Sequence, residues 1–247
     1  MTAQKATGEP VTILIPTWQE EEALPATIAN IAAMDPPPDE VLLVDGGSKD
    51  ATVQLAKDAG FRAIIAPKKG RGPQINHGVE EAEGPIVLVL HADSILPPDA
   101  ITHVRQTLSN RTISLGTFLP IIRGKKTRWG TTLHNWIKTW YPIVTHPHLF
   151  VRGVRLLFGD HAMFFRREDF LAVGGIPDDA TIMEEADLCI GMATRGKLKM
   201  TRKPVITSDR RIAHWGPLKA NYLYLKIGIM WSFGVRKKLG DIYPDIR

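Results

Sequence analysis

The chain has 247 residues, 44% of them hydrophobic and 23% charged, which is the composition of a globular protein with enough material for a buried core. Its net charge of +5 is a mild basic excess that suits phosphates, anionic lipid or nucleic acid without choosing among them. The single cysteine, Cys189, excludes an intrachain disulfide. The polar start of the sequence argues against a signal peptide. The lack of about 18 successive uncharged apolar residues argues against a membrane-spanning helix. We therefore expect a cytoplasmic protein.

The first hundred residues alternate short apolar runs with patterns typical of helices. We predict strands at residues 11–17, 41–44, 61–67 and 85–90. Apolar residues at helical spacing predict helices at 20–34, 48–60 and 75–82. This alternation favours an α/β fold with a mostly parallel sheet, and strands that are apolar throughout indicate helices on both faces.

Polar and charged residues follow each predicted strand. They are Thr17 to Glu21, Asp45, Lys68 to Arg71, and His91 to Asp93. In open α/β sheets the ligand binds at the carboxyl ends of the strands, so we expect these residues to converge on one rim.

Several of these residues have two readings. A carboxylate at a strand end, such as Asp93, can hold a divalent cation that neutralises a diphosphate, or it can cap the turn at 94–98. Asp45 can accept bonds from a nucleotide base or ribose, or serve as a turn acid before the next helix. The basic loop at 68–71 suits a phosphate or is a solvated loop, and it does not fit the P-loop pattern.

The second half is less regular, but it also carries charged clusters. Glu184, Glu185 and Asp187 suit a general base, or are acids favoured by a helix N-terminus. Arg210 and Arg211 can bind a leaving diphosphate or lie on the surface. The candidate metal ligands beside Asp93 are His91 and His214, although a histidine next to a tryptophan is also compatible with simple packing.

The segment 218–238 is apolar on most sides and ends in Arg236, Lys237 and Lys238. It is too short and too charged to span a membrane. It fits a helix in the interface of the inner face of the cell membrane, and it equally fits a core helix or a homodimer contact. We predict no nucleic-acid partner.

Taken in order, the motifs resemble those of family 2 glycosyltransferases with the GT-A fold. The matching stretches are "VTILIPTWQEEEAL", "VLLVDGGSKDAT", a basic loop with "NHG", "HAD", and "VGGIPDDATIMEEADLC". The likeness covers residues 11 to about 212 and is closest to a small bacterial subgroup with an H-A-D variant of the D-x-D motif. It implies a Rossmann-like sheet with flanking helices and a C-terminal helical segment.

The resemblance also implies roles. The residues expected around a nucleotide-sugar donor are Pro16, Thr17, Glu20, Glu21, Asp45, Lys68, Arg71, Arg210 and Arg211. Asp93 would bind Mg²⁺ or Mn²⁺, and Glu185 would deprotonate the acceptor hydroxyl during an inverting displacement. We expect one domain over 1–247, with donor binding in 10–112, the acceptor side and catalysis in 113–216, and an amphipathic helix in 217–247.

Three departures from the family pattern separate the chain from its usual members. Each replaces an aspartate of the family pattern: Gly46 the second Asp of V-D-D, His91 the first Asp of D-x-D, and Glu185 the Asp expected as the base. A sugar nucleotidyltransferase remains an alternative, although "PTWQEEE" lacks the Gly-rich loop expected after its first strand. A non-catalytic protein that binds nucleotide or docks on membranes is the second alternative. The sequence leaves the acceptor open between a lipid-linked and a small polar molecule.

Overall fold

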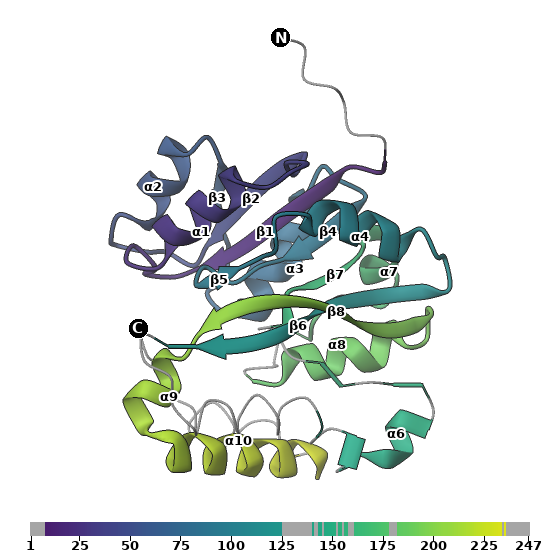
Figure 1. Cartoon of the computed structure of the whole chain (residues 1–247). Coiled ribbons are helices and arrows are strands. Elements are labelled where there is room, and N and C mark those ends of the chain that lie inside the picture. Colours follow the sequence, from purple (N-terminus) through teal and green to yellow (C-terminus); the bar gives the residue numbers. More distant parts are fainter. Residues whose placement is uncertain are drawn as a thin grey trace.

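The computed structural model describes residues 8–124, 140, 143–144, 146–151, 153–154, 156–157, 161–177, 182–233 and 235. One curled sheet runs through it, with helices packed above and below (Figure 1). The helices are α1 (Leu24–Ala32), α2 (Thr52–Asp58), α3 (Arg71–Glu81), α4 (Ala100–Leu108), α6 (Pro147–Val151), α7 (Arg167–Ala172), α8 (Glu184–Met192), α9 (Arg210–Trp215) and α10 (Pro217–Ser232).

The sheet has eight strands in the order β3-β2-β1-β4-β7-β6-β8-β5. Their bounds are β1 (Val11–Thr17), β2 (Glu40–Asp45), β3 (Arg62–Ile65), β4 (Ile86–Val89), β5 (Ser94–Ile95), β6 (Ile113–Arg123), β7 (Met163–Arg166) and β8 (Lys197–Ser208). The first four strands are mutually parallel, as predicted. The register pairs Thr17 with Asp45, so β1 and β2 end level with one another.

Both faces of the parallel part pack into apolar cores, which explains strands whose apolar residues point to both faces. In β1, Ile13 and Ile15 join the core formed with α1 and α4, whereas Leu14 joins the core formed with α3 and α8. Gly78 lets α3 approach the sheet closely, because a Cβ there would lie 2.4 Å from Leu14 Cδ1. Among β1 to β4, β3 at the sheet edge is the one strand with no fully buried residue.

The second half completes the same sheet with a different pattern. Strand β7 runs antiparallel between β4 and β6, and the long β8 pairs parallel with β6 and antiparallel with β5. Strand β8 was not predicted from the sequence. Its burial roughly alternates along the strand, which is the period-two signal that could have identified it.

The C-terminal helices lie below the sheet in the view of Figure 1. Helix α9 follows β8 and leads through Gly216 into α10, and α6 lies near the far end of α10. The fold predicted for the chain is confirmed: a mixed α/β sheet with flanking helices and a C-terminal helical segment. No helix in the described ranges is long and apolar enough to cross a membrane.

Candidate functional site

The rim formed by the ends of β1 and β2 is held together by a buried glutamine. Gln74 Nε2, from α3, donates to the carbonyl of Thr17 at 2.6 Å and to the carbonyl of Val44 at 2.8 Å. These bonds join the carboxyl ends of both strands to the helix beneath them. Gln74 was not among the predicted site residues, since a lone glutamine in a helical pattern carries no motif.

Asp45 is fully buried at the end of β2, and its carboxylate shapes the turn that follows. One oxygen accepts from the backbone N–H of Gly47 at 2.7 Å and of Ser48 at 2.6 Å. The other accepts from the hydroxyl of Ser48 at 2.5 Å and from that of Thr17 at 3.3 Å. A carboxylate has about four acceptor positions, so these four donors fill it. Asp45 therefore acts as a turn acid here.

Hydrogen bonds join the loop after β1 to the loop after β2. The backbone N–H of Gln19, a residue with a left-handed φ of 55°, donates to Ser48 Oγ at 2.7 Å. Exposed Glu21 accepts from the N–H of Ala51 at 3.0 Å. The two loops therefore form one wall of the rim, with partly exposed Pro16 at its base.

The ammonium group of Lys69 lies over the ring of Trp18, near the start of this wall. Lys69 Nζ is 3.1 Å from the ring centroid of Trp18, and the neighbouring Lys68 is exposed. The contact orders the basic loop against the end of β1. Both residues fall within the predicted rim segments 17–21 and 68–71, although the list of donor-binding residues named neither.

Arg210 joins two carboxylates from the first half of the chain. Its guanidinium bonds both oxygens of Glu20, at 2.9 and 3.1 Å, and lies 3.4 Å from Asp93 Oδ2. The other oxygen of Asp93 accepts from Thr207 Oγ1 at 3.4 Å. We call these residues the Arg210 centre. Both contacts of Asp93 are long, whereas Glu20 is held by a short bidentate pair.

Arg71 makes a second cluster of the same kind, the Arg71 centre. Its Nη1 lies 3.2 Å from Glu185 Oε1 and 3.5 Å from Glu184 Oε1. Both glutamates are buried in the first turn of α8, where the positive end of the helix favours them. Met183, the residue just before them, has a left-handed φ of 65°. Strained backbone at this point is a feature of functional sites.

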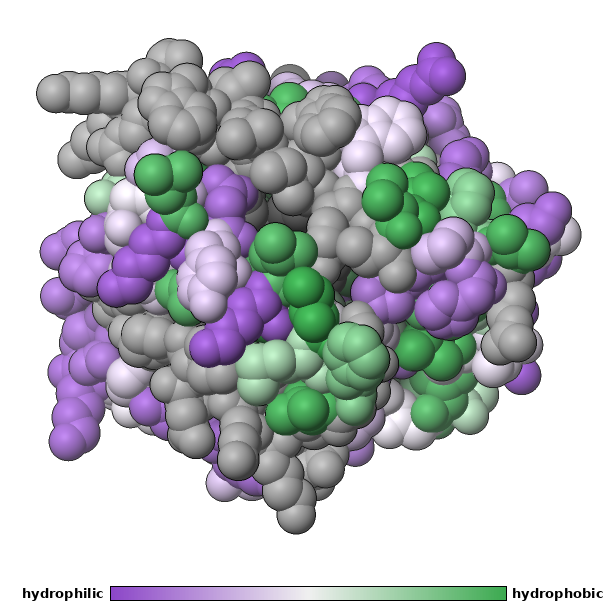
Figure 2. All heavy atoms as spheres, turned by 90° about the horizontal axis from the view of Figure 1, so that it is seen from below, coloured by the Kyte–Doolittle hydropathy of each residue, from purple (hydrophilic) through white to green (hydrophobic). Residues whose placement is uncertain are grey.

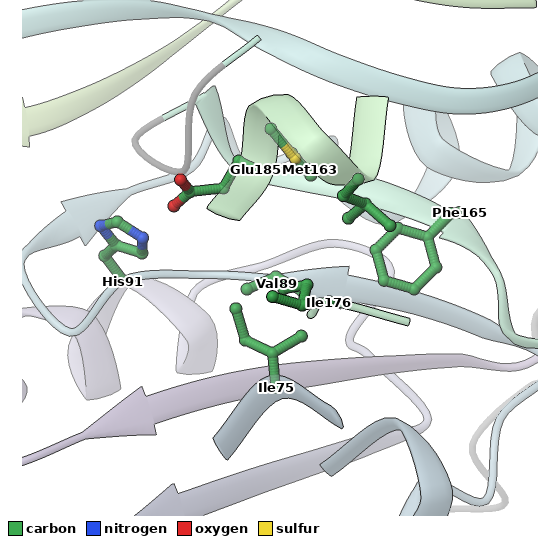
Figure 3. Close-up of a pocket in the computed structure, with 8 residues that line it drawn as sticks. Ile75, Val89, His91, Met163, Phe165, Ile176 and Glu185 are labelled. Carbon is green, nitrogen blue, oxygen red and sulfur yellow. The ribbon is translucent and has the colours of Figure 1, made fainter. Parts of the chain in front are cut away.

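A small pocket opens beside Glu185. Apolar side chains line most of it, from Ile75, Val89, Met163, Phe165, Ile176 and Leu188. Figure 3 shows the Glu185 carboxylate and the His91 imidazole facing one another at the polar end. Asp187 lies two residues after Glu185 in α8 and is partly exposed. Cys189 is buried below them, and burial together with these acids raises the pKa of its thiol to about 12, so it is not a nucleophile.

The predicted metal ligands do not form a ready cluster. Within the described residues, no three His, Cys, Asp or Glu side chains are gathered closely enough to hold an ion. Asp93 belongs to the Arg210 centre, His91 faces Glu185, and His214 is exposed in the last turn of α9. The side chain of Arg211 lies outside what the structure describes.

This geometry describes an α/β protein with a polar site at the carboxyl edge of its parallel strands. The model of the family "Glycosyl transferase family 2" matches residues 12–174. The chain belongs to that family.

Curated relatives cover part of the chain. A glycosyltransferase of Mycobacterium tuberculosis is 38% identical over 86 residues, which is 35% of this chain and 38% of that protein. The glycosyltransferase AglJ of Haloferax volcanii is 36% identical over 35% of this chain and 28% of its own length. An undecaprenyl-phosphate 4-deoxy-4-formamido-L-arabinose transferase of Aeromonas hydrophila is 34% identical over 37% of this chain and 31% of its own. The matches thus span about a third of these relatives.

Solved structures share the fold. A mannosyltransferase from Pyrobaculum calidifontis in complex with GDP-Man and Mn²⁺ superposes with a TM-score of 0.63 at 18% identity, over 81% of this chain and 56% of that one. Glucosyl-3-phosphoglycerate synthase from Mycobacterium tuberculosis, in complex with Mn²⁺, UDP and phosphoglyceric acid, gives 0.64 at 20% identity, over 85% and 74%. At such identities the likeness establishes the GT-A fold.

Proposed function

We propose that this protein transfers a sugar from a nucleotide-sugar donor to an acceptor hydroxyl. The observation that carries the proposal is the convergence of separate family motifs on one rim. Glu20, Asp93 and Arg210 meet in one centre, although Glu20 and Arg210 are 190 positions apart in the sequence. Family membership and solved relatives that hold GDP-Man or UDP support the same reaction.

We assign donor binding to residues 10–112. In this proposal the wall made by the loops after β1 and β2 contacts the nucleotide, with Pro16, Thr17, Glu21 and the turn fixed by Asp45. Exposed Lys68 would supply positive charge for the phosphates, and Arg211 remains a candidate for the same role from its sequence position. Residues 113–216 would contribute the catalytic carboxylate and face the acceptor.

Asp93 fits a divalent cation at the donor diphosphate. Mg²⁺ is commonly held by one or two carboxylates together with substrate phosphates, so a three-ligand protein cluster is not needed. The contacts of Asp93 to Arg210 and Thr207 are both 3.4 Å, which leaves its oxygens available for a closer partner. When bound, the cation would neutralise charge on the departing diphosphate. Carboxylate oxygen suits Mg²⁺ or Mn²⁺ better than imidazole does, so His91 and His214 are the secondary candidates.

Glu185 is our candidate for the general base. Its carboxylate lies at the polar end of a pocket and is positioned by Arg71 at 3.2 Å. The proton of the attacking acceptor hydroxyl would pass to a Glu185 oxygen as the new bond forms at the anomeric carbon and the bond to the diphosphate breaks. A single displacement of this kind inverts the configuration. Glu184 shares the arginine, and Arg210 would stabilise the leaving diphosphate.

The test is a panel of nucleotide sugars, with release of nucleoside diphosphate as the readout. The protein is incubated with UDP-, GDP-, dTDP- and ADP-sugars, with Mg²⁺ or Mn²⁺, and with nucleoside triphosphate plus sugar 1-phosphate in parallel. Release from one donor class supports a transferase. Pyrophosphate formed from the triphosphate mixture identifies a nucleotidyltransferase instead. A folded protein that neither binds any of these donors nor releases diphosphate from them contradicts the proposal.

A further inference from the structure

Helix α10 carries two apolar stripes on opposite sides. The inward stripe consists of Ala220, Tyr224, Ile227 and Trp231, which join the core clusters. The outward stripe has the same spacing of four, three and four residues, with Leu218 at 76% exposed, Tyr222 at 62%, Leu225 at 45% and Ile229 at 44%. Because an α-helix has 3.6 residues per turn, each set lies along one line of the helix. The core explains the first stripe and not the second.

The outward stripe belongs to a larger exposed face. Phe233 continues it beyond α10, and Val144, Phe150 and Val151 are exposed around α6. The packing of His146 on Trp231, with ring centroids 5.8 Å apart, holds the α6 segment against α10. Figure 2, which views the molecule from the α10 side, shows hydrophobic residues in green at several places on this face. Exposed apolar side chains gathered in this way mark a contact surface.

Among the described residues, two lysines flank the outward stripe. Exposed Lys219 and Lys226, seven residues apart, follow one line beside the outward stripe. In the sequence, residues 123–158 contain seven Lys and Arg and no Asp or Glu, and residues 210–240 again contain seven and none. These two segments therefore carry +14, and the rest of the chain carries −9, since the total is +5.

We propose that the α10–α6 face docks on an anionic lipid bilayer. An exposed apolar stripe flanked by lysines is the pattern of a helix that lies in the membrane interface, where acyl chains receive the apolar side chains and acidic head groups receive the lysines. A second copy of this face would instead bring two basic surfaces together, which opposes a symmetric dimer through it. This inference does not depend on the sugar-transfer reaction.

The experiment is co-sedimentation of the full chain with vesicles of phosphatidylcholine alone and with about 30% phosphatidylglycerol, at about 0.1 and 0.5 M NaCl. We expect binding to the anionic vesicles, weakened by salt. The variant Leu218→Ser/Leu225→Ser/Ile229→Ser should lose at least about tenfold in partitioning, since three apolar anchors are removed. These side chains point away from the core, and circular dichroism verifies folding.

The matched control is Ile65→Ser/Leu171→Ser/Ile190→Ser, which removes three exposed apolar side chains elsewhere on the molecule. It should bind vesicles like the wild type. Lys219→Glu/Lys226→Glu should lose binding to anionic vesicles in particular. Equal binding by both triple variants, or absence of wild-type binding, overturns the proposal. Sedimentation velocity tests self-association. If the wild type is a dimer and only the α10 triple variant is a monomer, the face serves self-association and the membrane proposal is overturned.

Discussion

The Arg71 centre and the Arg210 centre each contain one arginine and two carboxylates. In each, the arginine and the carboxylates come from different halves of the chain, and the halves are exchanged between the two centres. Arg71 comes from the first half of the chain and reaches two carboxylates of α8. Arg210 comes from the second half and reaches Glu20 and Asp93 in the first. Each centre joins two carboxylates to one arginine, so each retains one negative charge when all groups are ionised. The two arginines thus brace the halves of the sheet against each other.

The difference between the centres lies in how firmly each carboxylate is held. The partners of Arg71 are both buried, in the first turn of one helix. In the Arg210 centre, Glu20 is bound bidentately, whereas Asp93 has only contacts of 3.4 Å. One centre therefore presents a fixed carboxylate suited to proton transfer, and the other a carboxylate that can exchange its partner for a cation. This contrast can be tested residue by residue.

The largest expected effect separates the two acids of the Arg71 centre. We expect Glu185→Gln to lower kcat by about 10²- to 10⁴-fold, the usual contribution of a general base, while donor affinity changes little. Glu184→Gln leaves the Glu185 carboxylate at the pocket in place, so its kcat should fall far less. Steady-state kinetics with the donor identified from the panel gives both values. Equal losses in the two variants would contradict the assignment of Glu185 as the base.

The next effect concerns the bidentate pair. Arg210→Gln removes the bidentate ion pair of the buried Glu20 carboxylate. Because Arg210 is about a third exposed, we expect a loss of about 1–3 kcal/mol in unfolding free energy. The donor should also bind about tenfold more weakly. Arg210→Lys retains the charge without the fork, so its losses should be intermediate. Urea unfolding and calorimetry measure the two effects, and unchanged donor affinity in Arg210→Gln would remove Arg210 from the donor site.

Arg71→Gln should have a smaller effect on stability. Arg71 has a 35% exposed side chain, so solvent compensates part of the lost ion pairs with Glu184 and Glu185, and we expect about 1 kcal/mol. Activity should fall more than donor affinity, because the arginine positions the base. A variant that loses donor affinity while its kcat is retained would show that Arg71 faces the donor instead.

The smallest expected effect lies outside both centres. The pKa of His146 is lowered by burial and, secondarily, by the nearby His148. The folded state therefore binds its proton less readily than the unfolded state. This contribution to stability is present above the unfolded pKa of about 6.5 and is lost as pH falls from there through the lower folded pKa. Urea unfolding at pH 7.5 and 5.5 should show a smaller loss in His146→Gln than in the wild type. An identical pH dependence in both proteins would contradict this account.

The sequence predicted the parallel half well because its signals are local. Apolar runs such as Val11–Thr17 are punctuated by polar residues, and the ends of such runs meet at one edge in any parallel sheet. The resemblance named Asp93, Glu185 and Arg210 as candidate site residues, and the structure brings Asp93 and Arg210 within 3.4 Å of one another.

Other features could not be predicted from the sequence because they depend on tertiary contacts. Nothing local indicates that Arg210 pairs with Glu20, or that Arg71 turns to Glu185. The role of Asp45 as a saturated turn acid depends on where Ser48 and Thr17 lie. The two stripes of α10 were read as one helix that is apolar on most sides, since the sequence does not reveal which stripe meets the core.

The most direct test of the central claim is calorimetric titration of nucleoside diphosphates and nucleotide sugars, with and without Mn²⁺ or Mg²⁺, into the wild type and Asp93→Asn. The account predicts that one nucleotide binds in a metal-dependent way, and that Asp93→Asn removes the metal dependence while the protein stays folded. Absence of binding by every nucleotide, or binding whose metal dependence survives in Asp93→Asn, would contradict a donor site at this rim.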